Sequence, residues 1–127
     1  MKHKVLWGLA AFYLVTGLYI AIAPLSFYQN APGVLETGPY NMHFLRDVGF
    51  AFTVSALGIG FGLANRLKPL ILFGSAWLCI HGVFHLVLWI VHPNHAAPSA
   101  LVDLVIVVLP AALLSYLAAS WRPPTEI

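Results

Sequence analysis

Long apolar stretches alternate with short polar ones along this chain of 127 residues. Four of the apolar stretches approach the roughly 20 residues that a helix needs to cross the apolar core of a bilayer. They cover about residues 5–25, 43–64, 69–91 and 100–120. Backbone polar groups in lipid must be satisfied within the segment, so each stretch is predicted to be a helix. The pattern therefore predicts an all-α fold: one domain over residues 1–127, built as a bundle of four transmembrane helices.

Local signals add detail to this prediction. Asn41 stands directly before the second stretch and is a good helix N-cap. Pro110 stands inside the fourth stretch, where it predicts a kink because proline has no backbone N–H. Small residues at helix surfaces permit close approach in membranes, so Gly58, Gly60 and Gly62 predict a tight contact made by the second helix.

Composition supports a membrane protein and weakens other classes. Hydrophobic residues make up 61% of the chain, charged residues make up 8%, and the mean hydropathy is +0.88. Soluble domains carry about 25% charged residues. The expected partner is thus the lipid bilayer. A formal charge of +2 without a basic patch argues against nucleic-acid binding. No motif names a reaction, so enzymatic activity stays open.

The basic residues predict the orientation of the bundle. An even number of spans places both termini on the same side of the membrane. The predicted outer loops, about residues 26–42 and 92–99, contain no Lys or Arg, and Arg46 belongs to the second span. Positive residues concentrate on the cytoplasmic side of membrane proteins, so both termini are predicted to be cytoplasmic. The basic residues expected on that side are Lys2, Lys4, Arg66, Lys68 and Arg122.

Ionisable side chains gather in the predicted outer half of the bundle. His43 and Asp47 are four residues apart and share one helix face, as do His81 and His85. Asp103 follows the start of the fourth span by about 5 Å, at 1.5 Å per residue. Ionisable groups inside a membrane are costly and commonly functional. Their convergence therefore marks this half as the expected site.

The leading hypothesis is a transition-metal site in a redox-associated protein. Imidazole and carboxylate ligands together suit copper, zinc or iron, and i, i+4 pairs on facing helices are a known way to hold metals in bundles. The expected ligands are His43, Asp47, His81, His85 and Asp103. When residues are counted from the turn between the second and third spans, the positions of Asp47 and His85 along the helix axis differ by about 3 Å. These two residues are therefore the expected closest pair. Asp103 is the expected substitute for a ligand that does not reach.

Three alternatives remain open. A haem would need His43 opposite His81 or His85. A quinone or lipid site would use the same histidines, with Tyr19, Arg46 and Trp89 as further cofactor-binding residues. The third alternative is a scaffold or accessory subunit without a cofactor, which would assemble as a homo-oligomer or within a larger membrane complex. In that case Arg46 would pair with Asp47 or Asp103, and the network would only orient the helices.

The segment "GPYNMHFLRDVGFAF", a tight basic turn and "HGVFH" together resemble a group of small bacterial four-helix membrane proteins described as DoxX-like or of unknown function. The most specific part is the pattern N-x-H-F-x-R-D-x-G, whose positions are Asn41, His43, Phe44, Arg46, Asp47 and Gly49. The resemblance covers most of the chain. It implies a bundle in a bacterial inner membrane, and it implies no established activity or site.

Overall fold

The computed structural model describes residues 1–91 and 97–123, and within these ranges the chain is helical without any strand. The elements are α1 (Lys2–Ile22), α2 (Pro24–Asn30), the 3-10 helix η1 (Val34–Thr37), α3 (Met42–Ala64), α4 (Lys68–Val91), α5 (Ala97–Asp103), the π-helical turn η2 (Leu104–Val108) and α6 (Leu109–Ser120). Helices α1, α3 and α4 and the continuous helical stretch Ala100–Ser120 are long and apolar enough to cross a membrane. The all-α prediction with four candidate spans is confirmed.

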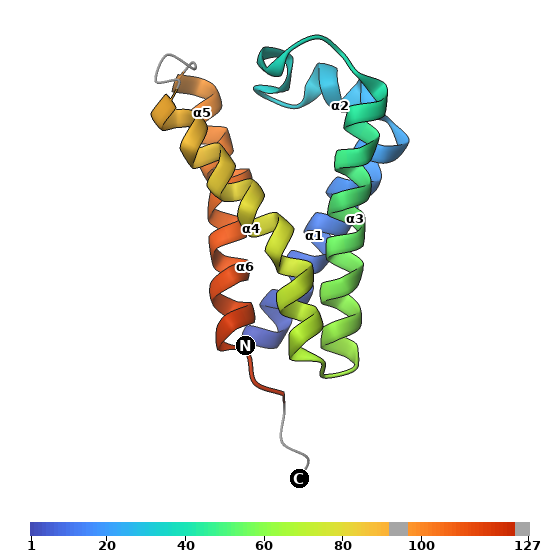
Figure 1. The fold of residues 1–127 in the computed structure, drawn as a ribbon, viewed down its shortest axis with the longest axis vertical. Coiled ribbons are helices and arrows are strands. Elements are labelled where there is room, and N and C mark those ends of the chain that lie inside the picture. Colours follow the sequence, from blue (N-terminus) through green and yellow to red (C-terminus); the bar gives the residue numbers. More distant parts are fainter. Residues whose placement is uncertain (92–96, 124–127) are drawn as a thin grey trace.

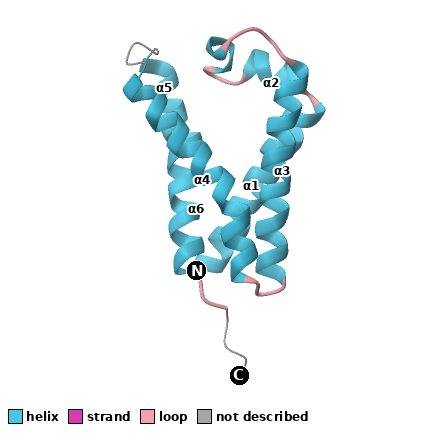
Figure 2. Cartoon of the chain, viewed as in Figure 1, coloured by secondary structure: helices cyan, strands magenta, loops and turns pink. Residues whose placement is uncertain are grey.

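The four spans run up and down, so the bundle has two distinct ends (Figures 1 and 2). Met1, the turn between α3 and α4, and the end of α6 lie at one end, which we call the termini end. Helices α2 and α5 and the 3-10 helix η1 lie at the other, which we call the loop end. The start of the first span and the end of the fourth span therefore lie at the same end of the bundle, as an even number of spans predicts.

Pro24 ends the first span earlier than expected. Helix α1 stops at Ile22, and Ala23 leaves the helical region with φ −125° and ψ 57°. Proline disfavours helical geometry in the residue before it and begins a new helix readily, because its missing N–H is not needed there. Pro24 accordingly starts the short helix α2 at the loop end. The predicted boundary near residue 25 was wrong by about three residues for this reason.

The fourth span contains a π-helical turn beside Pro110. The N–H of Leu109 donates to the carbonyl of Leu104, a spacing of five residues instead of four. Pro110, in the first turn of α6, has no N–H to donate to the carbonyl four residues before it. Widening of the helix next to this proline takes the form of one π-helical turn, and such turns are found frequently at functional sites. The irregularity that Pro110 predicted lies just before it.

Glycines bring α1, α3 and α4 into backbone contact. A Cβ atom on Gly49 would lie 2.6 Å from the backbone nitrogen of Ala21, and one on Gly17 would lie 2.7 Å from that of Thr53. A Cβ on Gly62 would lie 2.9 Å from the nitrogen of Ile71. The close approach predicted at Gly62 is thus confirmed, and the α1–α3 contact is equally tight. At Gly58 the nearest atom would be 3.6 Å away, and at Gly60 it would be 3.4 Å away, on the Trp7 side chain, so these two positions are less restricted.

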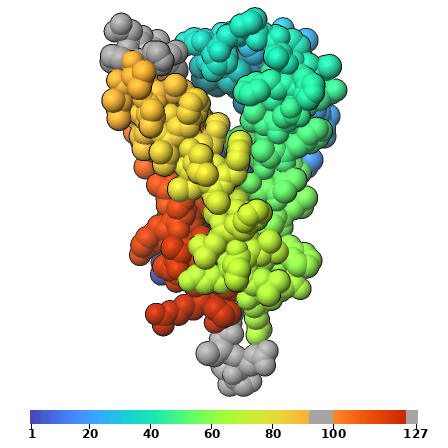
Figure 3. Space-filling view, in the orientation of Figure 1, coloured from blue at the N-terminus to red at the C-terminus, as the bar shows by residue number. Residues whose placement is uncertain are grey.

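Helices α3 and α4 pack together near the termini end and separate toward the loop end (Figure 1). In the space-filling view their surfaces meet over the lower part of the molecule, and the yellow surface of α4 turns away above it (Figure 3). The largest fully buried side chains are those of Leu6, Ile20, Ile59, Ile71, Leu78 and Leu114. The separation decides which polar residues of α3 and α4 can meet.

The turn between α3 and α4 depends on a residue in a left-handed conformation. Arg66 has φ 59°, and no other non-glycine residue in the described ranges has a positive φ. The carbonyl of Gly62 accepts the N–H of Leu67 at 2.8 Å, which closes the turn immediately after the helix. A left-handed residue after the last helical turn is a common way to end a helix. The antiparallel α3–α4 hairpin is therefore short and well defined.

Candidate functional site

The loop half of the bundle contains a histidine–aspartate pair that joins two separate helices. Nδ1 of His85 on α4 lies 3.0 Å from Oδ2 of Asp103 at the end of α5. The side chains are only 20% and 25% exposed. An unpaired polar group in such surroundings costs free energy, and the contact satisfies both partners. The pair thus links the third and fourth spans at a point where few polar groups are available.

The π-helical turn sets the direction of Asp103. This residue is the last of α5, and η2 begins at the next position. One extra residue in a helical turn rotates the helix on its N-terminal side by about 100° relative to the helix on its C-terminal side. The turn therefore allows α6 to pack against α4 through its own apolar face while Asp103 still reaches His85.

His81 continues this polar group toward the middle of the bundle. Its ring is stacked on that of Trp77, with centroids 5.0 Å apart and planes inclined by 10°. The ring of His85 meets it edge-on at 4.8 Å, and Phe52 of α3 packs at 5.4 Å. His81 is half-buried, and neither ring nitrogen bonds to a described residue. Trp77 and Phe52 thus border His81, and His81 in turn meets His85, which is the one of these two histidines with a hydrogen bond to a described residue.

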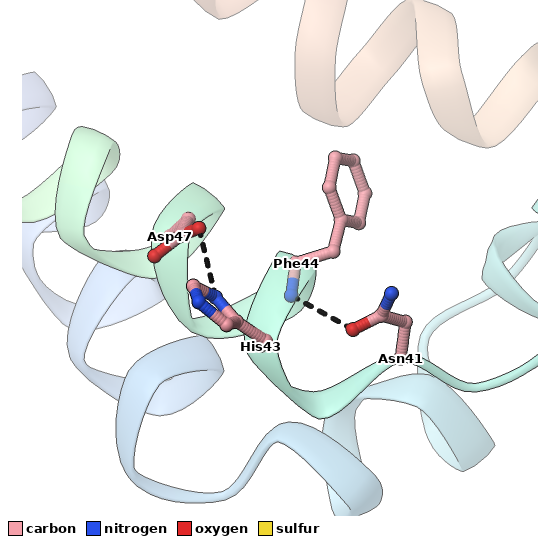
Figure 4. Close-up of polar contacts among 4 residues, drawn as sticks. All are labelled: Asn41, His43, Phe44 and Asp47. Carbon is pink, nitrogen blue, oxygen red and sulfur yellow. Dashed lines mark hydrogen bonds and ion pairs between the residues drawn. The ribbon is translucent and has the colours of Figure 1, made fainter.

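A second histidine–aspartate pair lies apart from the first, on α3. Nδ1 of His43 is 3.0 Å from Oδ2 of Asp47, and these side chains are 86% and 61% exposed. Figure 4 shows both side chains lying along α3 itself, next to the N-terminal cap in which Asn41 Oδ1 accepts the N–H of Phe44 at 3.0 Å. The predicted Asn41 cap is confirmed. Both members of this pair belong to one exposed helix face.

The structure therefore divides the predicted ligand set. The Asp47–His85 pair that was expected does not form, because α3 and α4 diverge at the loop end and Asp47 pairs with His43 instead (Figure 1). Asp103, the expected substitute, is the partner of His85. Within residues 1–91 and 97–123, no group of three or more His, Cys, Asp or Glu side chains is placed to hold one metal ion.

The three other predicted residues lie in separate places. The hydroxyl of Tyr19 is 3.0 Å from Oγ of Ser26, so it holds α2 against α1. Arg46 is exposed on α3 and forms no ion pair with a described residue, so the predicted pairing with Asp47 or Asp103 is absent from that part of the chain. Trp89 is half-buried on α4, one turn beyond His85. Of these three, only Trp89 is close in sequence to the inter-helix pair.

Two core aromatic residues were not predicted as part of the site. Phe52 touches the rings of Trp77 and His81, and it also packs at 5.9 Å against Tyr13 of α1. The Tyr13 hydroxyl is buried and has no hydrogen-bond partner in the described part of the chain. Buried tyrosine hydroxyls usually have one. Aromatic residues occur in every span, so the sequence offered no signal that singled out these two.

Comparisons with known proteins give no match: no family model, curated protein or solved structure is significantly similar to the chain. The DoxX-like resemblance therefore stays a prediction. The chemistry of the site has to be judged from its own side chains.

Proposed function

We propose that the protein is a redox-associated membrane protein in which His81, His85 and Asp103 bind the head group of a quinone-type molecule. The observation that carries the proposal is the His85–Asp103 contact beside the His81–Trp77 stack. It combines a hydrogen-bonded imidazole, a second imidazole with available nitrogens and a flat aromatic surface. A quinone head group is planar, carries two hydrogen-bonding oxygens and dissolves in lipid, so each of its properties has a counterpart.

The His85–Asp103 pair supplies a proton-exchanging group. When the Asp103 carboxylate accepts the proton of Nδ1, the neutral imidazole presents its Nε2 lone pair on the other side. Nε2 then accepts a hydrogen bond from a quinol hydroxyl, and after protonation it donates one to a quinone oxygen. The Asp103 carboxylate accepts the Nδ1 proton in both states and stabilises the imidazolium once Nε2 is protonated. The electrons of any quinone reaction would pass to or from a partner protein in the membrane, with this chain binding the head group and exchanging its protons.

Binding of a short-tailed quinone to purified protein tests the proposal. Quenching of Trp77 fluorescence provides the signal in a protein whose other tryptophans are replaced by phenylalanine. We expect saturable quenching that weakens at least tenfold in His81→Ala and in His85→Ala. His43→Ala is the matched control, since it breaks the same type of pair on the exposed face of α3. Equal binding by all variants, or no saturable binding, would instead favour the accessory-subunit hypothesis.

A second candidate, a transition-metal site, is favoured by one specific contact. Metal-binding histidines commonly donate their other ring N–H to a carboxylate, and Asp103 is placed to accept that of His85. His81 and His85 would be the protein ligands. Zinc sites normally use three or four protein ligands, so water or a second chain would complete the coordination. Metal analysis of purified protein for copper, zinc and iron tests this: His85→Ala should lose the metal, whereas His43→Ala should retain it.

We further propose that the protein belongs to a bacterial inner membrane, with its termini end in the cytoplasm. The support is the position of Lys2, Lys68 and Arg122, together with Lys4 and Arg66, at or beside that end. In a Cys79→Ser background, a single cysteine at Glu36 should react with a membrane-impermeant reagent added outside the cell. One at Asn65 should react only after the membrane is opened. The reverse pattern would invert the orientation.

A further inference from the structure

A basic hollow opens at the termini end, far from the histidines. It has a volume of about 700 Å³ and is bordered by the first residues of α1, by Lys68 at the start of α4, and by residues 119–122 at and after the end of α6. Three cationic side chains from distant parts of the sequence meet here: Lys2, Lys68 and Arg122. The fold thus concentrates positive charge in one concave place.

The charge of the hollow is not balanced by its own lining. No carboxylate belongs to the described residues that border it. Glu36, Asp47 and Asp103 all lie in the half of the bundle nearest the loop end. Glu126, the remaining acidic residue, lies outside the described residues. An anion is therefore the ligand that this lining favours.

The lysines are oriented by neutral acceptors. The ammonium group of Lys68 donates to the carbonyl of Ala119 at 2.7 Å, and that of Lys2 donates to Oγ of Ser120 at 3.2 Å. These bonds satisfy groups at the end of α6, where cations are favourable. An ammonium group has three N–H donors, so donors remain available on both lysines. Arg122 borders the same hollow and is exposed, with a planar guanidinium that suits phosphate oxygens.

The position of the hollow along the bundle indicates the source of the anion. Lys2 is the first residue of α1, Lys68 is the first of α4, and Ser120 is the last of α6. The hollow therefore lies where three spans end, at the level of the membrane surface. Phosphate groups of lipids occupy this level, and basic pockets between transmembrane helices bind anionic head groups.

We propose that this hollow binds the phosphate of an anionic phospholipid. Lys2 and Lys68 contact the phosphate with their remaining donors, and Arg122 closes over it from the solvent side. Inorganic phosphate offers the same chemistry, so the test has to distinguish a lipid from a free ion.

Native mass spectrometry of the full chain, released from vesicles of phosphatidylcholine with one-fifth phosphatidylglycerol, provides this test. We expect one phosphatidylglycerol to remain bound, and its occupancy to fall about tenfold in a Lys2→Gln, Lys68→Gln, Arg122→Gln variant. Lys4→Gln is the matched control, since it removes a charge from the same end but does not border the hollow. Circular dichroism and gel filtration establish that each variant is folded.

Each alternative outcome counts against the proposal. Retention of phosphatidylglycerol by the triple variant, or equal loss in Lys4→Gln, would show that the lipid is held by general surface charge and overturn it. Displacement of the lipid by 10 mM inorganic phosphate, or a phosphate adduct in pure phosphatidylcholine, would assign the hollow to the free ion. Persistence of the lipid adduct in phosphate, with no phosphate adduct, supports the lipid.

Discussion

His43 and Asp47 are joined by the same 3.0 Å contact between Nδ1 and Oδ2 as His85 and Asp103, but their surroundings differ. The first pair lies four residues apart on one helix, with both side chains more than half exposed. The second pair connects α4 to α5 across 18 residues of sequence and is mostly buried. An exposed i, i+4 pair forms from the helix itself, whereas the second pair depends on how the helices pack.

The first contact is therefore determined by the local sequence, and the second by the tertiary structure. Exposed pairs of this type contribute about 0.3–0.5 kcal/mol. Removing one member of a partly buried pair costs more, because the other member loses its partner without gaining water. Four experiments, in decreasing order of effect, use the exposed pair as the reference for the buried one.

Deletion of Val105 should abolish the buried pair altogether. Removing one residue from the π-helical turn would rotate α5 by about 100° relative to α6 and move Asp103 away from His85. We expect a loss of about 3 kcal/mol in the free energy of unfolding, combining loss of the pair with repacking. Unfolding by denaturant in detergent measures it. In the deleted protein, a further His85→Leu change should cost almost nothing, and a full additional cost would mean that the π-helical turn does not position Asp103.

His85→Leu should destabilise the protein by about 2 kcal/mol, since it leaves the Asp103 carboxylate partly buried without its partner. His43→Leu should change stability by less than about 0.5 kcal/mol, as is usual for exposed positions. The same unfolding measurement compares the two variants. Similar values would indicate that water reaches Asp103 as freely as it reaches Asp47.

A double-mutant cycle should show a coupling of about 1 kcal/mol in one pair and almost none in the other. Replacing both His85 and Asp103 by leucine removes the unpaired group that each single change creates, so the double variant should be more stable than the sum of the singles predicts. The His43→Leu and Asp47→Leu changes should be additive within about 0.5 kcal/mol. Additivity in both cycles would remove the energetic distinction between the pairs.

Chemical modification should distinguish the pairs by a smaller factor. Diethyl pyrocarbonate reacts with accessible imidazole nitrogens, so His43 should be modified several-fold faster than His85. Mass spectrometry of peptides after short exposure measures both rates in one sample. Faster reaction at His85 would contradict the burial of the inter-helix pair.

The spans and the N-cap were predictable because their causes are local. Apolar stretches of spanning length become helices wherever lipid surrounds them, and Asn41 caps α3 through a residue three positions away. Pro24 was also a local signal, and hydropathy alone placed the end of α1 too late. At the end of α1, Pro24 marks the boundary more closely than hydropathy does.

The partner of His85 was harder to predict because it depends on helix direction in three dimensions. Counting residues from the α3–α4 turn assumed that the two helices stay side by side along their whole length. Close backbone contacts at Gly62 and Gly74 hold α3 and α4 together near the termini end, whereas the loop end has separated. The height of a residue along a helix is encoded locally, and the angle between helices is encoded by packing contacts far from the site.

Arg66 in the α3–α4 turn combines an unfavourable backbone conformation with a positive charge. Its left-handed conformation, φ 59°, costs about 1–2 kcal/mol for a residue with a Cβ, and glycine would avoid this cost. In the proposed orientation, with the termini end in the cytoplasm, glycine would also remove one of the positive charges that favour that orientation. If the proposed orientation holds, the backbone conformation at this position favours glycine, whereas the membrane orientation favours a positive charge.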